Sequence, residues 1–202
     1  MPSLCYCAPG ERPNVTEHQP LNTAPLPVKL RVEDYLLLDG SSAFEAYNKT
    51  ELIEGEVYFM NAQHRPHARV KSRLYLALAD SLKGTGLEAV VEGSVEIPPH
   101  NVPEPDIVVT SEPEGEGLIP LRSVHLIVEV ADSTLKADLS VKAAIYAREG
   151  VPEYWVVDVD ARVIHQMWAP EGELYSNRRE VAFGEPLTAA TISGLMVETA
   201  AV

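Results

Sequence analysis

The stretch His125–Asp158, HLIVEVADSTLKADLSVKAAIYAREGVPEYWVVD, decides the fold of this chain. The run of residues 124–130 is almost continuously apolar, which is typical of a strand covered on both faces. A helix is expected over residues 136–149, because a glycine follows it and a proline comes two residues later. A second buried strand is expected over residues 153–159. The pattern therefore predicts a strand, a helix and a second strand, with Glu129 near the end of the first strand.

The expected helix carries Asp138 and Lys142, and the direction of Lys142 matters for function. With about 100° per residue, Lys142 falls about 40° from Asp138 around the helix. The apolar residues on this side are Leu139, Val141, Ile145 and Tyr146. The opposite side carries Ala143, Ala144, Ala147 and Arg148, and alanine is neutral enough for that side to be covered as well. We expect Lys142 to point toward the core; the alternative is an exposed ion pair with Asp138.

Elements on either side of this unit complete a mixed α/β domain. Helices are expected at residues 32–38 and 66–83, strands at 87–97 and 106–110, and hairpin strands at 51–60, 162–168 and 173–183. The core order is then helix, strand, strand, strand, helix, strand, with flanking hairpins. Residues 1–28, which contain six prolines, are expected to form a flexible arm, and residues 29–202 a single domain.

Composition excludes several classes of protein. No apolar run approaches the ~18 residues needed to cross a bilayer, so no membrane association is expected. The first residues lack both a basic start and a long apolar segment, so they do not form a secretory signal, and a cytoplasmic location is expected. Cys5 and Cys7 are the only cysteines, and we expect two reduced surface thiols rather than a zinc site.

The formal net charge of −14, from 16 basic and 30 acidic side chains, bears on the choice of partners. Much of the affinity for nucleic acid comes from neutralising phosphates, so the overall charge disfavours nucleic acid as a partner. Arg65, Arg69 and Arg73 form the only concentrated basic feature, a stripe along the first long helix. Such a stripe is either a solvated face or a set of phosphate contacts.

Asp106 and Glu129 are the candidate metal ligands. Twenty-two residues lie between these two acids, and pairing of the strands that carry them would bring both carboxylates to one end of a sheet. Neighbouring carboxylates repel each other unless a cation lies between them, and Mg²⁺ or Mn²⁺ takes oxygen ligands of this kind. Such an ion activates a water and neutralises charge that develops on phosphorus. Taken singly, each acid is as readily explained as a solvated residue at a strand end.

Three other side chains are candidates for supporting roles. The ammonium of Lys142 would position the water or stabilise the transition state. His67 lies on the apolar arc of the first long helix and would reach the site from its far wall, unless it is a hydrogen-bonded core histidine. Glu56 flanks the turn of the 51–60 hairpin, where most acids are simply turn residues.

These residues resemble the Uma2 family, a branch of the PD-(D/E)xK restriction-endonuclease-like superfamily. The resemblance rests on ELIEGEVYFM, PEPDIVVT, LIVEVADSTLKADLSVK and YAREGVPEYWVVD, which lie between residues 51 and 158. It implies an endonuclease-like core in which Asp106 and Glu129 bind the metal. The superfamily lysine would stand at Ala131; the Uma2 pattern instead places a lysine on the following helix, here Lys142.

The resemblance also marks His67 and Asp138 as matching positions without fixing their roles, and it implies a homodimer. Three functions then compete. The first is a Mg²⁺- or Mn²⁺-dependent phosphodiesterase that cuts nucleic acid, the second an inactive endonuclease-like binding module, and the third a hydrolase of a small phosphate ester. The first requires the ammonium of Lys142 and the carboxylates of Asp106 and Glu129 to converge in one cleft.

Overall fold

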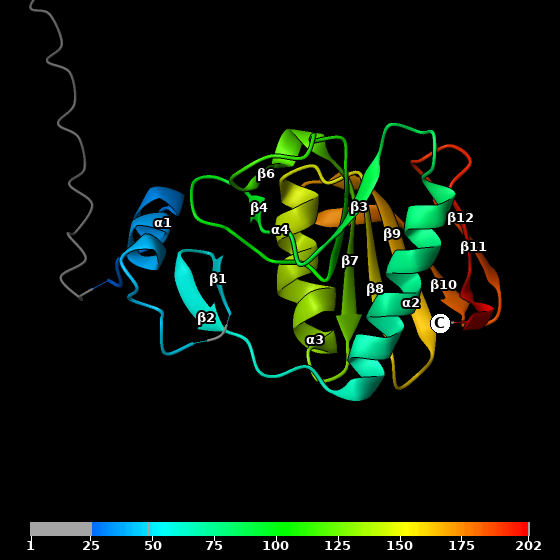
Figure 1. The fold of residues 1–202 in the computed structure, drawn as a ribbon, viewed down its shortest axis with the longest axis horizontal. Helices are drawn as coiled ribbons and strands as arrows, with labels where there is room; N and C mark the ends of the chain where they lie inside the picture. Colours follow the sequence, from blue (N-terminus) through cyan, green and yellow to red (C-terminus); the bar gives the residue numbers. More distant parts are fainter. Residues whose placement is uncertain (1–25, 48, 202) are drawn as a thin grey trace, which may run out of the picture.

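A six-stranded sheet runs through the centre of the computed structural model, which describes residues 26–47 and 49–201 (Figure 1). The strands are β3 Glu88–Val91, β5 Ile107–Thr110, β7 Val124–Ala131, β8 Glu153–Asp158, β9 Val163–Glu171 and β10 Leu174–Ala182. Their order is β10-β9-β8-β7-β5-β3, and within this sheet only β7 and β8 pair in parallel. The two strands predicted within His125–Asp158 are therefore present as the central parallel pair.

Helices cover both faces of this sheet. They are α2 Arg65–Ser81 on one face and, on the other, α3 Leu135–Ala137, a π-helical turn Asp138–Lys142 and α4 Ala143–Arg148. Val128 and Val130 of β7 share a core cluster with residues of α2, whereas Ile127 and Ala131 share a second cluster with residues of α4. Successive side chains of a strand point to opposite faces, so β7 is covered on both sides, as its apolar run predicts.

Smaller elements surround the sheet. They are α1 Val32–Gly40, the antiparallel pair β1 Thr50–Ile53 and β2 Glu56–Phe59, the parallel pair β4 Val95–Glu96 and β6 Ile119–Pro120, the antiparallel pair β11 Pro186–Thr188 and β12 Met196–Glu198, and short 3-10 turns at Leu121–Ser123 and Thr199–Ala201. In Figure 1, α1 and the β1–β2 hairpin lie together at the end of the molecule far from β10. No helix in the described part of the chain is long and apolar enough to span a membrane.

The N-terminal part of the chain is described only from residue 26 onward. Most of the arm predicted over residues 1–28 therefore lies outside the described residues, as do Cys5 and Cys7.

Two predicted strands were wrong in extent. Residues 87–97 do not form one strand, because β3 ends at Val91 and the next residue, Glu92, has a positive φ of 54°. Just beyond this point, at Gly93, an added Cβ would lie 2.6 Å from the end of the Ile119 side chain, so the backbone passes close to Ile119 there. Residues 173–183 are not a hairpin but essentially one strand, β10, at the edge of the sheet.

The helix after β7 also departs from the regular periodicity assumed for it. The π-helical turn Asp138–Lys142 carries an extra residue per turn, so residues after it are displaced around the axis. Val141, predicted to face the core, is 49% exposed, whereas Ala143 and Ala147, predicted on the opposite side, are buried. Asp138 and Lys142 nevertheless point inward as expected, because Asp138 is buried and the side chain of Lys142 is only 12% exposed.

A buried carboxylate anchors the C-terminal segment to the sheet. Glu153, at the start of β8, is completely buried and accepts hydrogen bonds from Trp155 Nε1 and Gln166 Nε2, each at 2.6 Å. The backbone amides of Ala190 and Thr191 donate to its other oxygen at 2.8 Å, and the Thr191 hydroxyl does the same. Nothing in the sequence distinguishes this acid from the exposed ones.

Candidate active site

Asp106 lies immediately before β5, and both of its carboxylate oxygens are held. The backbone amide of Val130 donates to Asp106 Oδ2 at 2.8 Å, and His67 Nε2 lies 3.2 Å from the same oxygen. Burial acts to raise the pKa of Asp106, but the hydrogen bonds from His67 and Val130 and the charge of Lys71 outweigh it and hold that pKa below its usual value. Asp106 is therefore an anion at neutral pH. It lies beside the backbone of Val130, the residue that follows Glu129.

Glu129 lies on β7 and points to the face covered by α4. Lys142 Nζ donates to Glu129 Oε1 at 2.9 Å, and the Tyr146 hydroxyl donates to the same oxygen at 3.2 Å. Within the described residues, Glu129 Oε2 accepts no hydrogen bond. This oxygen is not completely enclosed by protein atoms. One oxygen of Glu129 is therefore committed to Lys142, while the other is available to a ligand.

Glu51 is a site residue that the sequence did not reveal. It lies on β1, is 2% exposed, and accepts hydrogen bonds from Lys142 Nζ at 3.1 Å and from the Glu104 amide at 2.8 Å. Lys142 thus bridges two carboxylates from separate strands. The available signal was an acid at the start of the ELIEGE motif, a motif from which the prediction took Glu56 instead.

Electrostatics in this cluster favour a protonated Lys142 and resist ionisation of the acids around it. Burial raises the pKa of Glu129 to about 8 against the opposing effect of Lys142, with Asp138 and Asp106 adding to the rise. Burial likewise raises the pKa of Asp138. For Lys142, burial alone would lower the pKa, but the charges of Glu129 and Glu51 outweigh it and raise the pKa. Glu129 therefore favours its protonated form up to about pH 8, and a cation bound beside it would favour the ionised form.

A second cationic group approaches Asp106 from α2. Lys71 Nζ donates to Gln63 Oε1 and Glu92 Oε1, each at 2.6 Å, and lies 3.4 Å from Asp106 Oδ1. Gln63 Nε2 also donates to Asp106 Oδ1 at 3.3 Å. The helical periodicity places Lys71 only at the edge of the apolar arc of this helix, and nothing in the sequence pairs it with the residue at position 92.

Several predicted residues lie outside this cluster. Glu56 is exposed and pairs with Lys29 at 2.6 Å, so it does not support the site. The prediction of a supporting role for Glu56 was wrong because Glu51 and Glu56 lie at opposite ends of the β1–β2 hairpin. Arg65, Arg69 and Arg73 are all exposed on α2, on the side away from the buried His67 and Lys71.

The exposed arginines of α2 have no carboxylate partner among the described residues. The alternative considered for Lys142, an exposed ion pair with Asp138, is absent from the described part of the chain, because the ammonium is turned to Glu51 and Glu129 instead.

The donor set fits a hard divalent cation in chemistry. Asp106 and Glu129 offer carboxylate oxygens in neighbouring positions of the sheet, and Mg²⁺ uses only one or two carboxylates, completing its shell with water and substrate oxygens. In the described residues no group of three or more His, Cys, Asp or Glu side chains converges on one point as a closed metal site would require. Asp106 and Glu129 would therefore hold a metal only in an open, water-rich coordination.

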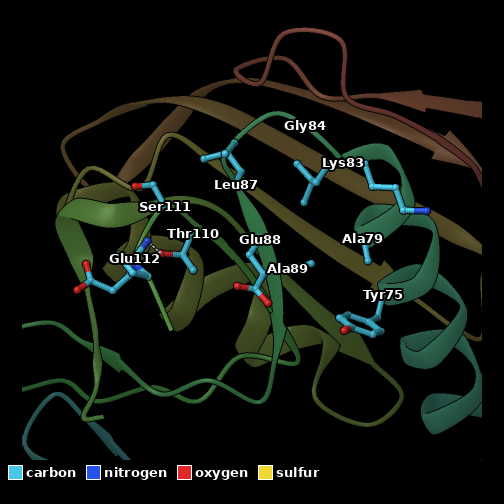
Figure 2. Close-up of a pocket in the computed structure, with 13 residues that line it drawn as sticks. Tyr75, Ala79, Lys83, Gly84, Leu87, Glu88, Ala89, Thr110, Ser111 and Glu112 are labelled. Carbon is cyan, nitrogen blue, oxygen red and sulfur yellow. Dashed lines mark hydrogen bonds between the residues drawn. The ribbon is translucent and has the colours of Figure 1, made fainter. Parts of the chain in front are cut away.

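Two cavities of the described structure are lined by neither Asp106 nor Glu129. One of about 590 Å³ lies between the end of α2 and β3, where Figure 2 shows Tyr75, Glu88 and Thr110 around it. A second, of about 300 Å³, is lined by Lys49 and Glu92 among others, so it adjoins the contacts of Lys71.

Comparison with known proteins identifies the family. The family model of Uma2, described as "Putative restriction endonuclease", matches residues 32–200, and the chain therefore belongs to the Uma2 family. The fold is similar to a crystal structure described as a "putative nuclease belonging to DUF820" from Anabaena variabilis ATCC 29413, with a TM-score of 0.64 and 16% identity. The match covers 85% of this chain and 96% of the other. No curated protein sequence matches.

The raised pKa of Glu129 predicts a pH-dependent stability. Between about 4.5, the usual value, and about 8, the folded protein binds a proton at Glu129 that the unfolded chain releases. The free energy of unfolding should then fall as pH rises through this window, by at most about 1.4 kcal/mol per pH unit. In Glu129→Gln this part of the slope should vanish, as measured by urea unfolding from pH 5 to 8.

The exposed Glu114 provides a control for that measurement, because Glu114→Gln removes the same charge from an exposed loop. A Glu129→Gln slope equal to that of the wild-type protein would show that Lys142 keeps Glu129 ionised in the folded state.

Proposed function

We propose that this protein is a metal-dependent phosphodiesterase that hydrolyses phosphodiester bonds of nucleic acid, with Asp106 and Glu129 as ligands of Mg²⁺ or Mn²⁺. Two contacts carry the proposal: Lys142 Nζ lies 2.9 Å from Glu129 Oε1, and the backbone amide of the next residue, Val130, donates to Asp106 Oδ2 at 2.8 Å. Ala131 supplies no cation on β7, and the ammonium of Lys142 lies beside Glu129 instead.

Each group has a role in the hydrolysis. A bound divalent cation would acidify the attacking water and neutralise negative charge on phosphorus. Lys142, fixed between Glu51 and Glu129, orients that water and stabilises the anionic transition state. The water oxygen bonds to phosphorus, the bond from phosphorus to one ester oxygen breaks, the departing oxygen takes up a proton, and the proton of the water passes to solvent.

His67 acts on Asp106 rather than on the substrate in this scheme. Its Nε2 contacts Asp106 Oδ2, while its buried Nδ1 has no hydrogen-bond partner in the described structure. The contact holds Asp106 in the orientation that its ligand role needs.

The test is cleavage of duplex DNA, single-stranded DNA and RNA by the purified protein with Mg²⁺ or Mn²⁺, with and without EDTA. A small diester, bis(p-nitrophenyl) phosphate, is included because the net charge of −14 penalises long polyanions more than small ones. Cleavage of the small diester alone would favour the small-ester function. Nucleic-acid binding without hydrolysis of any substrate would favour an inactive binding module.

The arginines of α2 give a prediction about nucleic-acid binding. If Arg65, Arg69 and Arg73 meet phosphates, the variant with all three changed to glutamine should bind duplex DNA more weakly. The slope of log K against log[salt] should drop by about 0.9 for each arginine that neutralises a phosphate in the wild-type protein. Fluorescence anisotropy in about 50 to 200 mM salt measures this slope. An unchanged slope would mean that the stripe is only a solvated helix face.

The homodimer implied by the family resemblance is part of the same proposal. A pair of sites would let one assembly cut both strands of a duplex. Light scattering after size-exclusion chromatography tests it, and a monomer at all concentrations would limit each encounter to a single cut.

A further inference from the structure

A buried lysine on α2 has no role in the chemistry described so far. Lys71 is 7% exposed and lies one helical turn after His67, so both side chains leave the same face of α2. They contact different oxygens of Asp106: His67 Nε2 approaches Oδ2 at 3.2 Å and Lys71 Nζ approaches Oδ1 at 3.4 Å. Both oxygens of Asp106 therefore have a neighbour on α2.

The three contacts of Lys71 differ in length. Two are short, at 2.6 Å to Gln63 Oε1 and to Glu92 Oε1, whereas the approach to Asp106 Oδ1 at 3.4 Å is longer than a charge-assisted hydrogen bond of about 2.8 Å. An ammonium has three N–H donors. Two short contacts thus use two of these donors, and the remaining approach, to Asp106, is too long for a full charge-assisted hydrogen bond.

The surroundings of Lys71 hold it in this position. Glu92 has a positive φ of 54° at the point where the chain leaves β3, a conformation that costs a non-glycine residue about 1 kcal/mol or more. Glu92 Oε1 also lies 3.6 Å from Lys49 Nζ and 3.2 Å from Gln63 Nε2. The backbone therefore adopts an unfavourable conformation at the residue that anchors the ammonium.

Burying an ammonium is costly, and an apolar residue would serve packing better at this position of α2. The site already has a lysine, Lys142, that arrives from the opposite face of the sheet and serves Glu129 and Glu51. Lys71 serves Asp106 and Glu92 from the α2 face. The two lysines thus flank the pair of candidate metal ligands from two different helices.

We propose that Lys71 is a second catalytic cation, which contacts a non-bridging oxygen of the substrate phosphate once a metal ion occupies Asp106. This inference rests on the proposed function. A divalent cation at Asp106 repels the ammonium, and the anchors at Gln63 and Glu92 keep it within reach of the phosphate that the metal binds. Its longest contact, to Asp106, is then exchanged for one to the substrate.

Two opposite changes in binding distinguish this role from a structural one. Lys71→Met removes a cation 3.4 Å from a metal ligand, so the variant should bind Mn²⁺ about tenfold more tightly without substrate. The same variant should bind a duplex oligonucleotide more weakly in Ca²⁺, which supports binding without cleavage, and should lose about 10²-fold in kcat/KM with Mg²⁺. Isothermal titration and anisotropy measure the two affinities.

Lys83→Met is the matched control, because it removes the same charge from an exposed position just beyond the end of α2. Lys71→Gln is made beside Lys71→Met, since glutamine removes the charge but can still bond to Gln63 and Glu92. Urea unfolding checks that each variant is folded.

The outcomes separate this inference from the function on which it rests. Tighter Mn²⁺ binding together with weaker duplex binding supports the role of Lys71. Weaker binding of both ligands would make Lys71 a support for Asp106 and overturn the inference, as would duplex binding unchanged in both variants. A wild-type protein that binds no duplex in Ca²⁺ overturns the proposed function, and the inference with it.

Discussion

Changing Asp106 to asparagine is expected to lower phosphodiester cleavage by about 10³-fold or more while leaving the protein folded. Asparagine keeps an oxygen for the Val130 amide, which lies 2.8 Å from the carboxylate, so the local geometry survives. The charge that would hold the divalent cation is removed, however, and a neutral amide is a poor ligand for Mg²⁺ when only one other carboxylate is present. Cleavage rates at saturating Mg²⁺ and the affinity for Mn²⁺ should fall together.

Glu56→Gln is the control for this experiment, because Glu56 is an acid of the same chain that pairs with Lys29 at the surface. It should leave cleavage within about twofold of the wild-type rate. An Asp106→Asn protein that keeps its full rate would exclude Asp106 as a metal ligand.

Asp106→Asn should also change stability in a pH-dependent way. The pKa of Asp106 is held below its usual value in the folded protein, so the ionised group stabilises the fold above about pH 4. That stabilisation disappears as pH falls through the folded pKa. The variant should therefore be less stable than wild type at pH 7, with a smaller difference at pH 3.

The largest effect on stability is expected for Glu153→Ala, at about 3 to 5 kcal/mol. This side chain is completely buried and accepts five hydrogen bonds, including those of Trp155 and Gln166. Its removal takes this acceptor away from the buried Trp155 and Gln166 side chains and also creates a cavity. Chemical denaturation measures the decrease, and hydrogen exchange should show the amides of Ala190 and Thr191 opening first.

Glu173→Ala provides the comparison, because Glu173 has an exposed side chain whose contact with Arg148 is 3.4 Å long. It should cost less than about 1 kcal/mol. A Glu153→Ala protein as stable as Glu173→Ala would show that water replaces the carboxylate as acceptor and that the C-terminal segment is held mainly by its apolar residues.

The fold could be predicted largely because apolar periodicity defines its centre. The runs around β5, β7 and β8 are continuous, and β5 and β8 are completely buried in the sheet. Elements held by contacts distant in sequence were harder to predict. Residues 87–97 have the β-branched content of one strand, but the positive φ at Glu92 and the close approach of Gly93 to Ile119 divide them.

The candidate site divides in the same way. Asp106, Glu129 and Lys142 could be selected because the sequence indicates their positions relative to the strands and the helix. Glu51 and Lys71 could not be selected in this way, because their partners are distant in sequence. Glu51 contacts Lys142, 91 positions away, and Lys71 contacts Glu92, 21 positions away. The helical periodicity of α2 places Lys71 at the edge of the apolar arc. Only the folded chain shows which carboxylates compensate its charge.

The π-helical turn Asp138–Lys142 has a consequence for how the chain and its relatives are aligned. This turn contains one residue more than a turn of α-helix. A related chain could therefore lack one residue at this point and still form a continuous helix. A relative that is one residue shorter between Asp138 and Ala143 would keep both strands, but its lysine would stand one residue nearer in sequence to the strand acid. Counting residues from the strand acid would then assign the lysine to the wrong column of an alignment, whereas superposing the ammonium positions would not.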